Sequence, residues 1–252
     1  GQVAATAAAP QVSFYAASRF AEQASFGPTP ALVAAIQAKG FAAWIDEQIA
    51  LPASQTSLAP HFVQTPGPND WNDIHAAFPN LAVAGPDQLR LRVAWVLSQL
   101  IVATDERGDV SGKLVFQNLL VSRALGRYET LLSDVSTNPF IGELYDIRAN
   151  RPRSSDCLGC APNENYAREL IERFSIGAVL LKDDGTAQRD NRGRPVPSYT
   201  QRDVRDLTRA LSGWSFDPVA IDSPRLPRDW GNWRKPMVSS NWPGDRDFGA
   251  KQ

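Results

Sequence analysis

Hydrophobic residues recur at helical spacing along most of the chain. A segment that starts at Ser13 places Phe14, Ala17 and Ala21 on one side, and the glycine and prolines that follow it end the pattern. Because apolar residues three and four positions apart share one face of a helix, this segment predicts an amphipathic helix. The same pattern predicts helices over residues 31–40, 41–52, 86–103, 112–125, 128–137, 140–147, 163–178 and 200–214.

Two regions break this periodicity. Residues 52–86 are rich in Pro, Ser, Asn and Gly, so we expect a long irregular connection with one helical turn at residues 73–78. After Trp214 the chain has no amphipathic period but is rich in proline and tryptophan, which predicts an ordered loop that packs against the rest of the molecule. The predicted fold class is therefore mainly α: an irregular multi-helix bundle with long loops and a Pro/Trp-rich C-terminal segment.

Composition and charge are those of an ordinary globular protein. Of the 252 residues 43% are hydrophobic and 21% are charged, so disorder is not the expectation. The formal net charge is -1, which gives no overall field to attract nucleic acid. The most apolar run, residues 89–103, contains two arginines, so we expect no membrane-spanning helix. We predict a flexible stub over residues 1–12 and a single helical domain over residues 13–252.

The N-terminal sequence and the cysteines favour an exported protein. The chain opens with Gly1 and a run of small residues, GQVAATAAAP, of the kind that remains after a signal peptide is cleaved. Cys157 and Cys160 are the two cysteines of the chain, and in an oxidising compartment such a pair most simply forms a disulfide. We therefore expect a periplasmic, cell-surface or extracellular location.

The cysteine pair has other interpretations as well. It could provide half of a zinc site, act as a redox centre or form part of a catalytic corner. A zinc site needs two more soft ligands, and the chain offers only His61 and His75, which are not in a paired spacing. The sequence thus favours a stapled loop, leaves a catalytic corner open, and disfavours a redox switch and a zinc site.

The segment that follows the cysteines is predicted to form an amphipathic helix with ion pairs along its surface. Tyr166, Leu170 and Phe174 form one apolar face, and Asn163 after a proline is a suitable N-cap. Opposite charges four residues apart predict ion pairs that would stabilise the helix. These pairs are Glu164 with Arg168, Arg168 with Glu172, and Glu169 with Arg173.

A functional interpretation of the same helix rests on its carboxylates. A half-buried Glu164 or Glu169 could have a raised pKa, or could hold a hard cation together with Asp203 or Asp206 of the next predicted helix. These four are the candidate catalytic residues. No metal ligand set or cofactor is predicted from the sequence, with a hard cation such as calcium as the one alternative left open. Candidate ligand-binding residues are Asn163, Asn165, Arg168, Trp214, Trp230 and Trp233, because exposed tryptophans can stack on sugar rings.

The glycine-containing segment after this helix carries a weaker signal. Residues 182–195 contain Asp183, Asp184, Asp190 and Asn191, but the alternating order of a calcium-binding loop is missing. An Asp-Gly turn is the simpler interpretation. The chain also lacks a glycine-rich phosphate loop and a Gly-x-Ser-x-Gly sequence, which disfavours the common cofactor enzymes and serine hydrolases.

A series of motifs resembles a known family. In order, these motifs are GFAAWIDEQIALP, LRLRVAWVLSQLIV, PNENYARELIERFSIG, a DGT turn and YTQRDVRDLTRALSGW. The series is similar to the bacterial family catalogued as domain of unknown function 1800, from Ser13 to the end of the chain. The resemblance implies an exported protein that is the N-terminal part of a longer chain, and it favours a disulfide between Cys157 and Cys160. Arg246 stands where the family pattern has a histidine, which argues against a metal or acid-base role there.

These observations leave two functions. The first is an envelope or extracellular binding or assembly module, whose partners would be the C-terminal remainder of the protein, an extracellular polymer or another exported protein. The second is a hydrolase-like enzyme, acting on glycans through two carboxyl groups about 5 to 10 Å apart or through a carboxylate-bound cation. Whether the protein is an enzyme stays open at this point.

Overall fold

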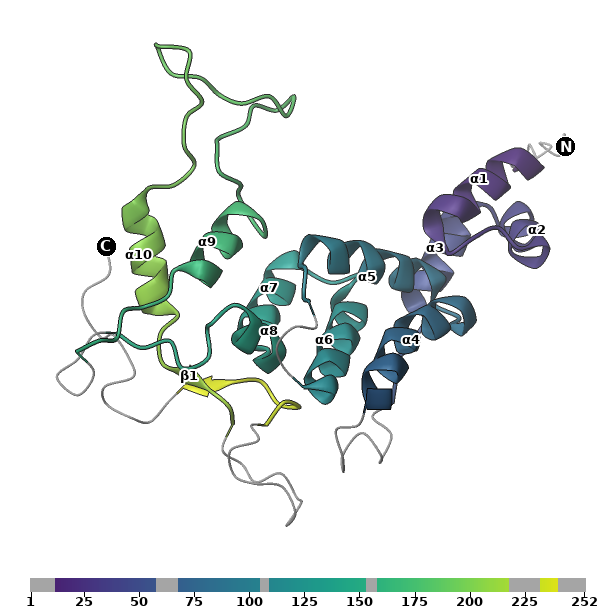
Figure 1. Cartoon of the computed structure of the whole chain (residues 1–252). Coiled ribbons are helices and arrows are strands. Elements are labelled where there is room, and N and C mark those ends of the chain that lie inside the picture. The colour runs from purple at the N-terminus through teal and green to yellow at the C-terminus, as the bar shows by residue number, and fades with distance from the viewer. Residues whose placement is uncertain (1–11, 58–67, 105–108, 153–157, 218–231, 240–252) are drawn as a thin grey trace, which may run out of the picture.

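The protein is mainly helical. The computed structural model describes residues 12–57, 68–104, 109–152, 158–217 and 232–239, including side chains for all of these except residues 68–73. These residues form ten helices and one two-stranded antiparallel sheet, which confirms the predicted fold class. The first three helices lie at one end of the molecule, and an extended arm projects at the other end (Figure 1).

The N-terminal end is a three-helix unit with a small core of its own. Helices α1 (Phe14–Ala24), α2 (Pro30–Lys39) and α3 (Phe41–Ala50) follow the predicted boundaries closely. The hydroxyl groups of Ser13 and Thr29 accept hydrogen bonds from the first turns of α1 and α2, so both helices begin at side-chain caps. Their shared core consists of Ala17, Ala21, Ala24, Val33, Ile36 and Trp44.

Helix α4 corrects the prediction for residues 52–86. The sequence favoured one helical turn, whereas the structure has a helix over Pro68–Ala84 with Pro79 in its interior. An interior proline costs about 3 kcal/mol because it removes a hydrogen bond and crowds the preceding turn. Ile74, Phe78 and Ala82 nevertheless form one face, and Ile74 is completely buried. The free energy gained by burying this face against α6 outweighs the low helix propensity of this Pro-, Ser-, Asn- and Gly-rich sequence.

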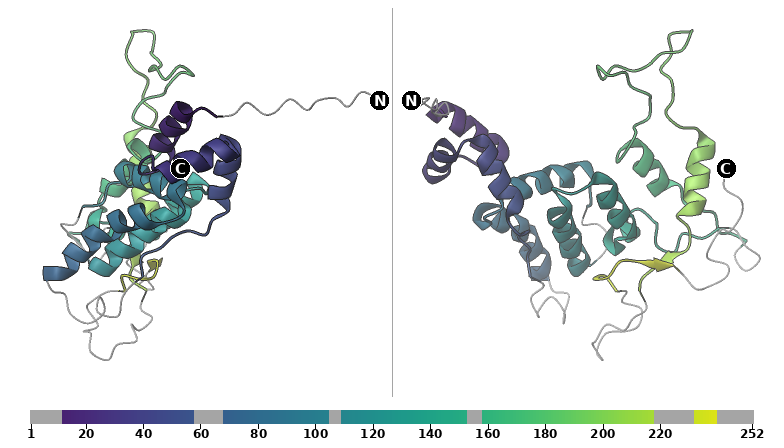
Figure 2. Two further views of the ribbon diagram at one scale, coloured as in Figure 1. Left: turned by 90° about the vertical axis from the view of Figure 1, so that its right-hand side faces the viewer. Right: turned by 180° about the vertical axis from the view of Figure 1, so that it is seen from behind.

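The central body consists of four further helices. Its elements are α5 (Gln88–Leu100), α6 (Val110–Arg123), α7 (Tyr128–Thr137) and α8 (Pro139–Leu144), and Figure 2 shows them from two further sides. Asn138 separates α7 from α8 and accepts hydrogen bonds from the first amides of α8. The body contains the main core, which includes Leu91, Phe116, Leu120, Leu131, Val135, Phe140, Ile141 and Ile147.

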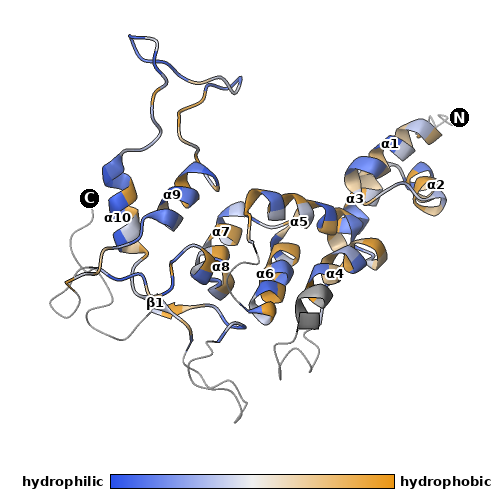
Figure 3. Cartoon of the chain, in the orientation of Figure 1, coloured by the Kyte–Doolittle hydropathy of each residue, from blue (hydrophilic) through white to orange (hydrophobic). Residues whose placement is uncertain are grey.

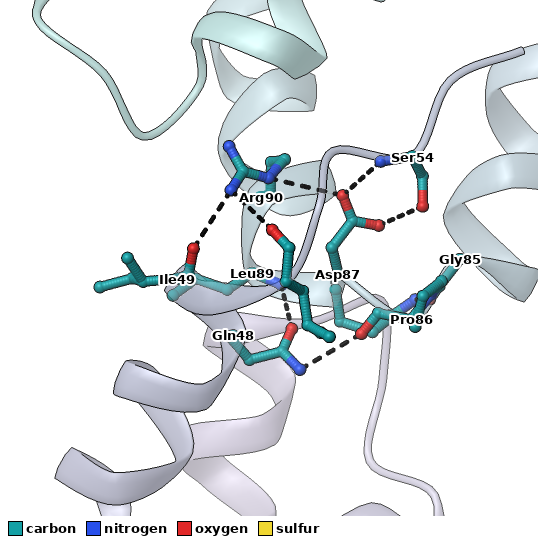
Figure 4. Close-up of polar contacts among 10 residues, drawn as sticks. Gln48, Ile49, Ser54, Gly85, Pro86, Asp87, Leu89 and Arg90 are labelled. Atoms are coloured by element: carbon teal, nitrogen blue, oxygen red, sulfur yellow. Dashed lines mark hydrogen bonds and ion pairs between the residues drawn. The ribbon is translucent and has the colours of Figure 1, made fainter.

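A buried polar network joins the N-terminal unit to this body (Figure 4). Asp87 is fully buried, and its carboxylate accepts hydrogen bonds from the backbone and the hydroxyl of Ser54 and lies 3.6 Å from Arg90 Nε. Arg90 also donates to the carbonyl oxygens at the end of α3, and the Gln48 side chain donates to the carbonyl of Pro86. One buried carboxylate thus fixes the connection between α3 and the start of α5.

Two more helices and an arm complete the described chain. Helices α9 (Asn165–Glu172) and α10 (Gln201–Ala210) pack side by side, and residues 176–199 leave the body between them as the arm. Both helices are shorter than predicted. Figure 3 shows that α10 is mainly hydrophilic, apart from the narrow face that buries Val204.

The described parts of the C-terminal segment, residues 214–217 and 232–239, pack on the body, in agreement with the predicted packing. Strands β1 (Trp214–Ser215) and β2 (Val238–Ser239) pair antiparallel, and the Met237 amide donates to the Thr137 carbonyl at 2.6 Å. Gly142 leaves room for the Met237 side chain, because a Cβ there would overlap the sulfur of Met237. Residues 218–231 and 240–252 lie outside the described residues, as do residues 1–11 of the stub predicted over residues 1–12.

Candidate functional site

The polar side chains of the predicted motif gather at the junction of α9 and α10. Arg168 Nη2 donates to Glu164 Oε2 at 2.9 Å and to Gln201 Oε1 at 3.0 Å, and Gln201 Nε2 donates to Glu164 Oε2 at 2.8 Å. The three side chains therefore form a closed ring between the two helices. Glu172 extends it, since it lies 4.0 Å from Arg168 and accepts a hydrogen bond from the Tyr199 hydroxyl.

The turn before α9 is held by a second set of amide contacts. The Asn150 side chain accepts from the backbone of Asn163 at 2.8 Å and donates to its carbonyl at 3.0 Å. Asn163 in turn donates to Asp146, and its Oδ1 accepts from the Asn165 amide at 2.8 Å. Asp146 and Ala149 both have positive φ values near 57°, so this corner carries backbone strain that the contacts stabilise.

This corner also changes the predicted start of the helix. The N-cap position of α9 is Glu164, whereas the sequence predicted Asn163. Asn163 lies one residue before the N-cap position, where Asn150 binds its backbone. The Asn163 side chain nevertheless accepts a hydrogen bond from the amide of Asn165, the first residue of the helix. The helix ends at Glu172, and beyond it Gly177, at φ 80°, turns the chain and donates to the Ile171 carbonyl.

The four candidate carboxylates have separate partners. Glu164 belongs to the α9–α10 ring, and Glu169 pairs with Arg173 at 2.8 Å. Asp203 accepts from the backbone and hydroxyl of Thr200 as part of a capping box, and Asp206 lies 3.3 Å from Arg209. All three ion pairs that the spacing of the α9 charges predicted are present.

Electrostatics at these residues follow from their hydrogen bonds and burial. The Thr200 hydroxyl holds the pKa of Asp203 below its usual value, so Asp203 is an anion at neutral pH. Burial raises the pKa of Tyr145, and the negative charge of Glu169 adds to this effect. Burial also raises the pKa of Tyr166 to about 12, although its hydrogen bond with Ser136 at 2.7 Å acts in the opposite direction.

The predicted ligand-binding residues are divided among three places. Asn163, Asn165 and Arg168 lie at or near the α9–α10 junction, and both asparagines are exposed. Trp214 lies in β1, where its carbonyl accepts from the Ala149 amide at 2.9 Å. Trp233 packs against Gly112 of α6 and lies edge-on to Phe216 at 4.9 Å. Trp230 and Cys157 lie outside the described residues, so the Cys157–Cys160 disulfide stays a prediction.

The arm is a feature that helical periodicity did not reveal. Its stem pairs residues 178–181 with 195–198, through the bridge of Val179 with Pro197 and the Leu180 amide bound to the Val196 carbonyl at 2.9 Å. Beyond the stem it forks into two short hairpins, bridged by Leu181 with Ala187 and by Arg189 with Pro195. The result is a Y-shaped arm that stands away from the helices (Figure 1).

Each branch of the arm ends in a turn closed by an aspartate. Asp184 Oδ1 accepts from the Thr186 amide at 2.9 Å and from its hydroxyl at 2.6 Å, which confirms the predicted Asp-Gly turn before Thr186. Asp190 accepts from the amides of Arg192 and Arg194 and from the Arg194 guanidinium. These hydrogen bonds lower the pKa of both aspartates. The turns are therefore held by local contacts and not by burial.

The base and the stem of the arm display apolar side chains to solvent. Ile176 is 60% exposed, Leu180 is 41% exposed and Leu181 is 55% exposed. No residue from Ser175 to Asp203 is buried, although every one of them is among the described residues. Large aliphatic side chains that are exposed on a projecting element are accessible to a binding partner.

The carboxylates of α9 and α10 are engaged in structural contacts. Within the described ranges, no three or more His, Cys, Asp or Glu side chains gather in a way that could hold a metal ion. No described helix is long and apolar enough to cross a membrane. The carboxylates act instead as acceptors for arginine, glutamine, threonine and tyrosine side chains, which fix α9 against α10 and the base of the arm.

Sequence reasoning missed Asn150, Tyr199 and Gln201. None of them belongs to a recurrent catalytic motif, and their roles depend on contacts between elements 13 to 37 residues apart. The arm did leave a signal in the sequence. Gly185 and Gly193 stand eight residues apart, each shortly after an aspartate, as in two successive tight turns.

Comparison with known proteins gives one match. A family model described as "Protein of unknown function (DUF1800)" matches residues 19–252. No curated protein and no solved structure matches the chain significantly. The matched range contains the α9–α10 junction, the strained corner before α9 and the whole arm.

Proposed function

Because the chain belongs to the DUF1800 family, whose description assigns no activity, we propose a function from its own geometry: an exported bacterial binding or assembly module that recognises its partner through the arm. The single observation that carries this proposal is the exposure of the apolar side chains of Ile176, Leu180 and Leu181 at the base and stem of the arm. The helices behind it position the arm through the α9–α10 ring and the Tyr199–Glu172 contact at its base.

The chemistry of the arm favours a protein partner over a polysaccharide. Carbohydrate recognition relies on aromatic faces, and the arm has one aromatic residue, Tyr199, whose hydroxyl is bound to Glu172. Exposed leucine and isoleucine side chains surrounded by arginine and aspartate match the apolar centre and polar rim of a protein interface. Short extended segments also provide backbone groups that a partner strand can bind.

The hydrolase alternative has no specific observation in its favour. Two carboxyl groups in glycan hydrolysis need access to substrate, and each candidate here is already bound to a basic or capping group. It stays a prediction that Glu164→Gln and Asp203→Asn variants would test in a glycan hydrolysis assay.

Export is supported by the pair of neighbouring cysteines with no third cysteine in the chain. Alkylation of protein isolated from cells tests it. We expect Cys157 and Cys160 to react only after reduction. Reaction of both thiols before reduction would contradict an oxidising location.

Site-specific photo-crosslinking in the producing bacterium tests recognition through the arm. A photoreactive residue at Leu181 should crosslink to one exported protein. The same residue at Val83 of α4, which is an aliphatic side chain with 84% exposure on the body, is the matched control. Equal crosslinking from both positions, or none from Leu181, would contradict the proposal.

A further inference from the structure

The two branches of the arm carry opposite charge. The first branch, residues 182–186, contains two aspartates and one lysine, whereas residues 189–194 of the second branch contain three arginines and one aspartate. All of these charged residues are exposed except Asp190, which is half-buried. One tip of the arm is therefore acidic and the other is basic.

Each tip has a charge that its own turn does not use. Asp184 and Asp190 close their turns, and Arg194 is paired with Asp190 at 2.9 Å. Asp183 and Arg192 are exposed, and among the described residues no side chain forms an ion pair or a hydrogen bond with either charge. These two charges are thus available to an oppositely charged group outside the chain.

The apolar side chains of the stem lie on one of its two strands. Leu180 and Leu181 belong to residues 178–181 and are exposed. The opposite strand contains Pro195 and Pro197, which have no N–H group and therefore protect a strand edge from pairing. The leucine-bearing strand is the side of the stem that is open to a partner.

The arrangement of the charges is self-complementary. The two branches point in different directions from the fork of the arm (Figure 1). A two-fold rotation about an axis through the fork therefore exchanges the positions of the acidic and basic tips. In a two-fold dimer every contact occurs twice with the roles of the copies reversed, so each acidic tip would meet the basic tip of the other copy.

We infer that the partner of the arm is a second copy of this chain. Asp183 of each copy faces Arg192 of the other, and the leucines of the two stems pack between these charge pairs. The inference rests on the proposed function, because it names the partner of the same arm. The arm, residues 176–199, is at most the size of one side of a standard interface, which has about 20–30 residues. The dimer is therefore reversible and sensitive to salt.

Sedimentation equilibrium of the whole chain measures this association. We expect a monomer–dimer equilibrium whose dissociation constant rises about threefold between ionic strengths of about 0.01 M and 0.15 M, because salt screens exposed charge pairs. A chain that stays monomeric at every concentration would overturn the inference. Association that salt does not weaken would overturn it too.

Exchange of the two charges assigns the association to the tips. Asp183→Lys and Arg192→Glu each place like charges at both contacts, so each variant should associate at least about tenfold more weakly than the unaltered chain. An equal mixture of the two variants should regain association, because the introduced lysine then faces the introduced glutamate. A chain with both changes should regain it as well. Failure to regain association in either case would contradict the pairing of Asp183 with Arg192.

The matched controls are the same charge changes on the N-terminal unit. Asp46→Lys on α3 and Arg19→Glu on α1 alter exposed residues far from the arm, and they should leave the dissociation constant unchanged. Weakening by the controls equal to that of the tip variants would show that net charge governs association, which would overturn the inference.

Crosslinking from Leu181 separates this inference from the proposed function. We expect a product with twice the mass of the chain, in which mass spectrometry finds the arm joined to a second arm. A crosslink to a different exported protein, from a chain that is monomeric in solution, would overturn the inference and leave the proposed function in place. Absence of any crosslink would contradict both.

Discussion

The helical body and the arm are ordered by different physical means. In the body, side chains such as Phe140 and Ile141 are completely inaccessible to solvent, and the polar Asp87 is buried with its partners. In the arm no side chain is buried, and order comes from backbone hydrogen bonds and the Asp184 and Asp190 turns. Stability therefore resides in the body, which leaves the side chains of the arm available for recognition.

The largest effect is expected at the buried carboxylate. Asp87→Ala should lower the free energy of unfolding by about 3–5 kcal/mol, because it removes the acceptor of the Ser54 amide and hydroxyl and the buried negative charge that faces the Arg90 guanidinium. Chemical denaturation measures this loss. The matched control is Asp134→Ala, which breaks a more exposed pair with Arg123 and should cost at most about 1 kcal/mol. Similar losses in the two variants would contradict the contrast between buried and exposed pairs.

The next effect concerns the contact that attaches the C-terminal segment. Gly142→Ala should destabilise the protein by about 1–3 kcal/mol, because the added methyl overlaps Met237. A double-mutant cycle with Met237→Ala should show coupling between the two sites. Gly159→Ala, where the added methyl meets nothing within 4 Å, is the control and should have little effect. Additive losses at Gly142 and Met237 would mean that this contact is not made.

Alkaline pH tests burial at the junction between body and arm. The pKa of Tyr166 is about 12 in the folded protein and about 10 in the unfolded chain. Its contribution to stability is therefore complete below pH 10 and is lost as the pH rises toward 12. The free energy of unfolding should fall by up to about 1.4 kcal/mol per pH unit in this range through Tyr166 alone.

Tyr166→Phe should make this alkaline decline shallower, and at neutral pH it should cost about 0.5–1.5 kcal/mol through the lost Ser136 hydrogen bond. Tyr15→Phe, at an 83% exposed tyrosine, is the control for loss of a hydroxyl group. Denaturation at a series of pH values separates the two variants. An unchanged pH dependence in Tyr166→Phe would contradict the burial of this group.

The smallest effect on stability is expected in the arm. Leu180→Ser and Leu181→Ser should each change the free energy of unfolding by no more than about 0.5 kcal/mol, since both side chains are exposed. Thermal and chemical denaturation measure this. A loss comparable to that of the body variants would mean that the arm is part of the core.

The sequence predicted the elements whose structure depends on residues close together in the chain. It missed the elements that depend on contacts between distant residues. Helices such as Tyr128–Thr137 matched their predicted bounds, because hydrophobic periodicity acts within a few residues. Helix α4 was missed because long-range burial of Ile74 offsets Pro79, and no local signal reports that burial. The arm was missed because an element exposed on all sides has no alternation of polar and apolar residues.

The candidate site shows the same limit. The ion pairs of Arg168 and Arg173 follow from spacing along one helix and were predicted. The contacts of Gln201 and Asn150 join residues distant in sequence, and their positions depend on how α10 and the strained corner pack. Side-chain contacts within one helix can thus be predicted from the sequence. Contacts between two elements can be identified only once the fold is known.

The central claim is that the arm recognises a partner without contributing to the stability of the body. The most direct test is a chain with Leu180→Ser and Leu181→Ser combined, which carries the photoreactive group at Ile176 and is compared with the same labelled chain without the two changes. We expect crosslinking to the partner to be lost while the unfolding midpoint stays the same. Retained crosslinking, or a loss of stability that accounts for its absence, would contradict the account.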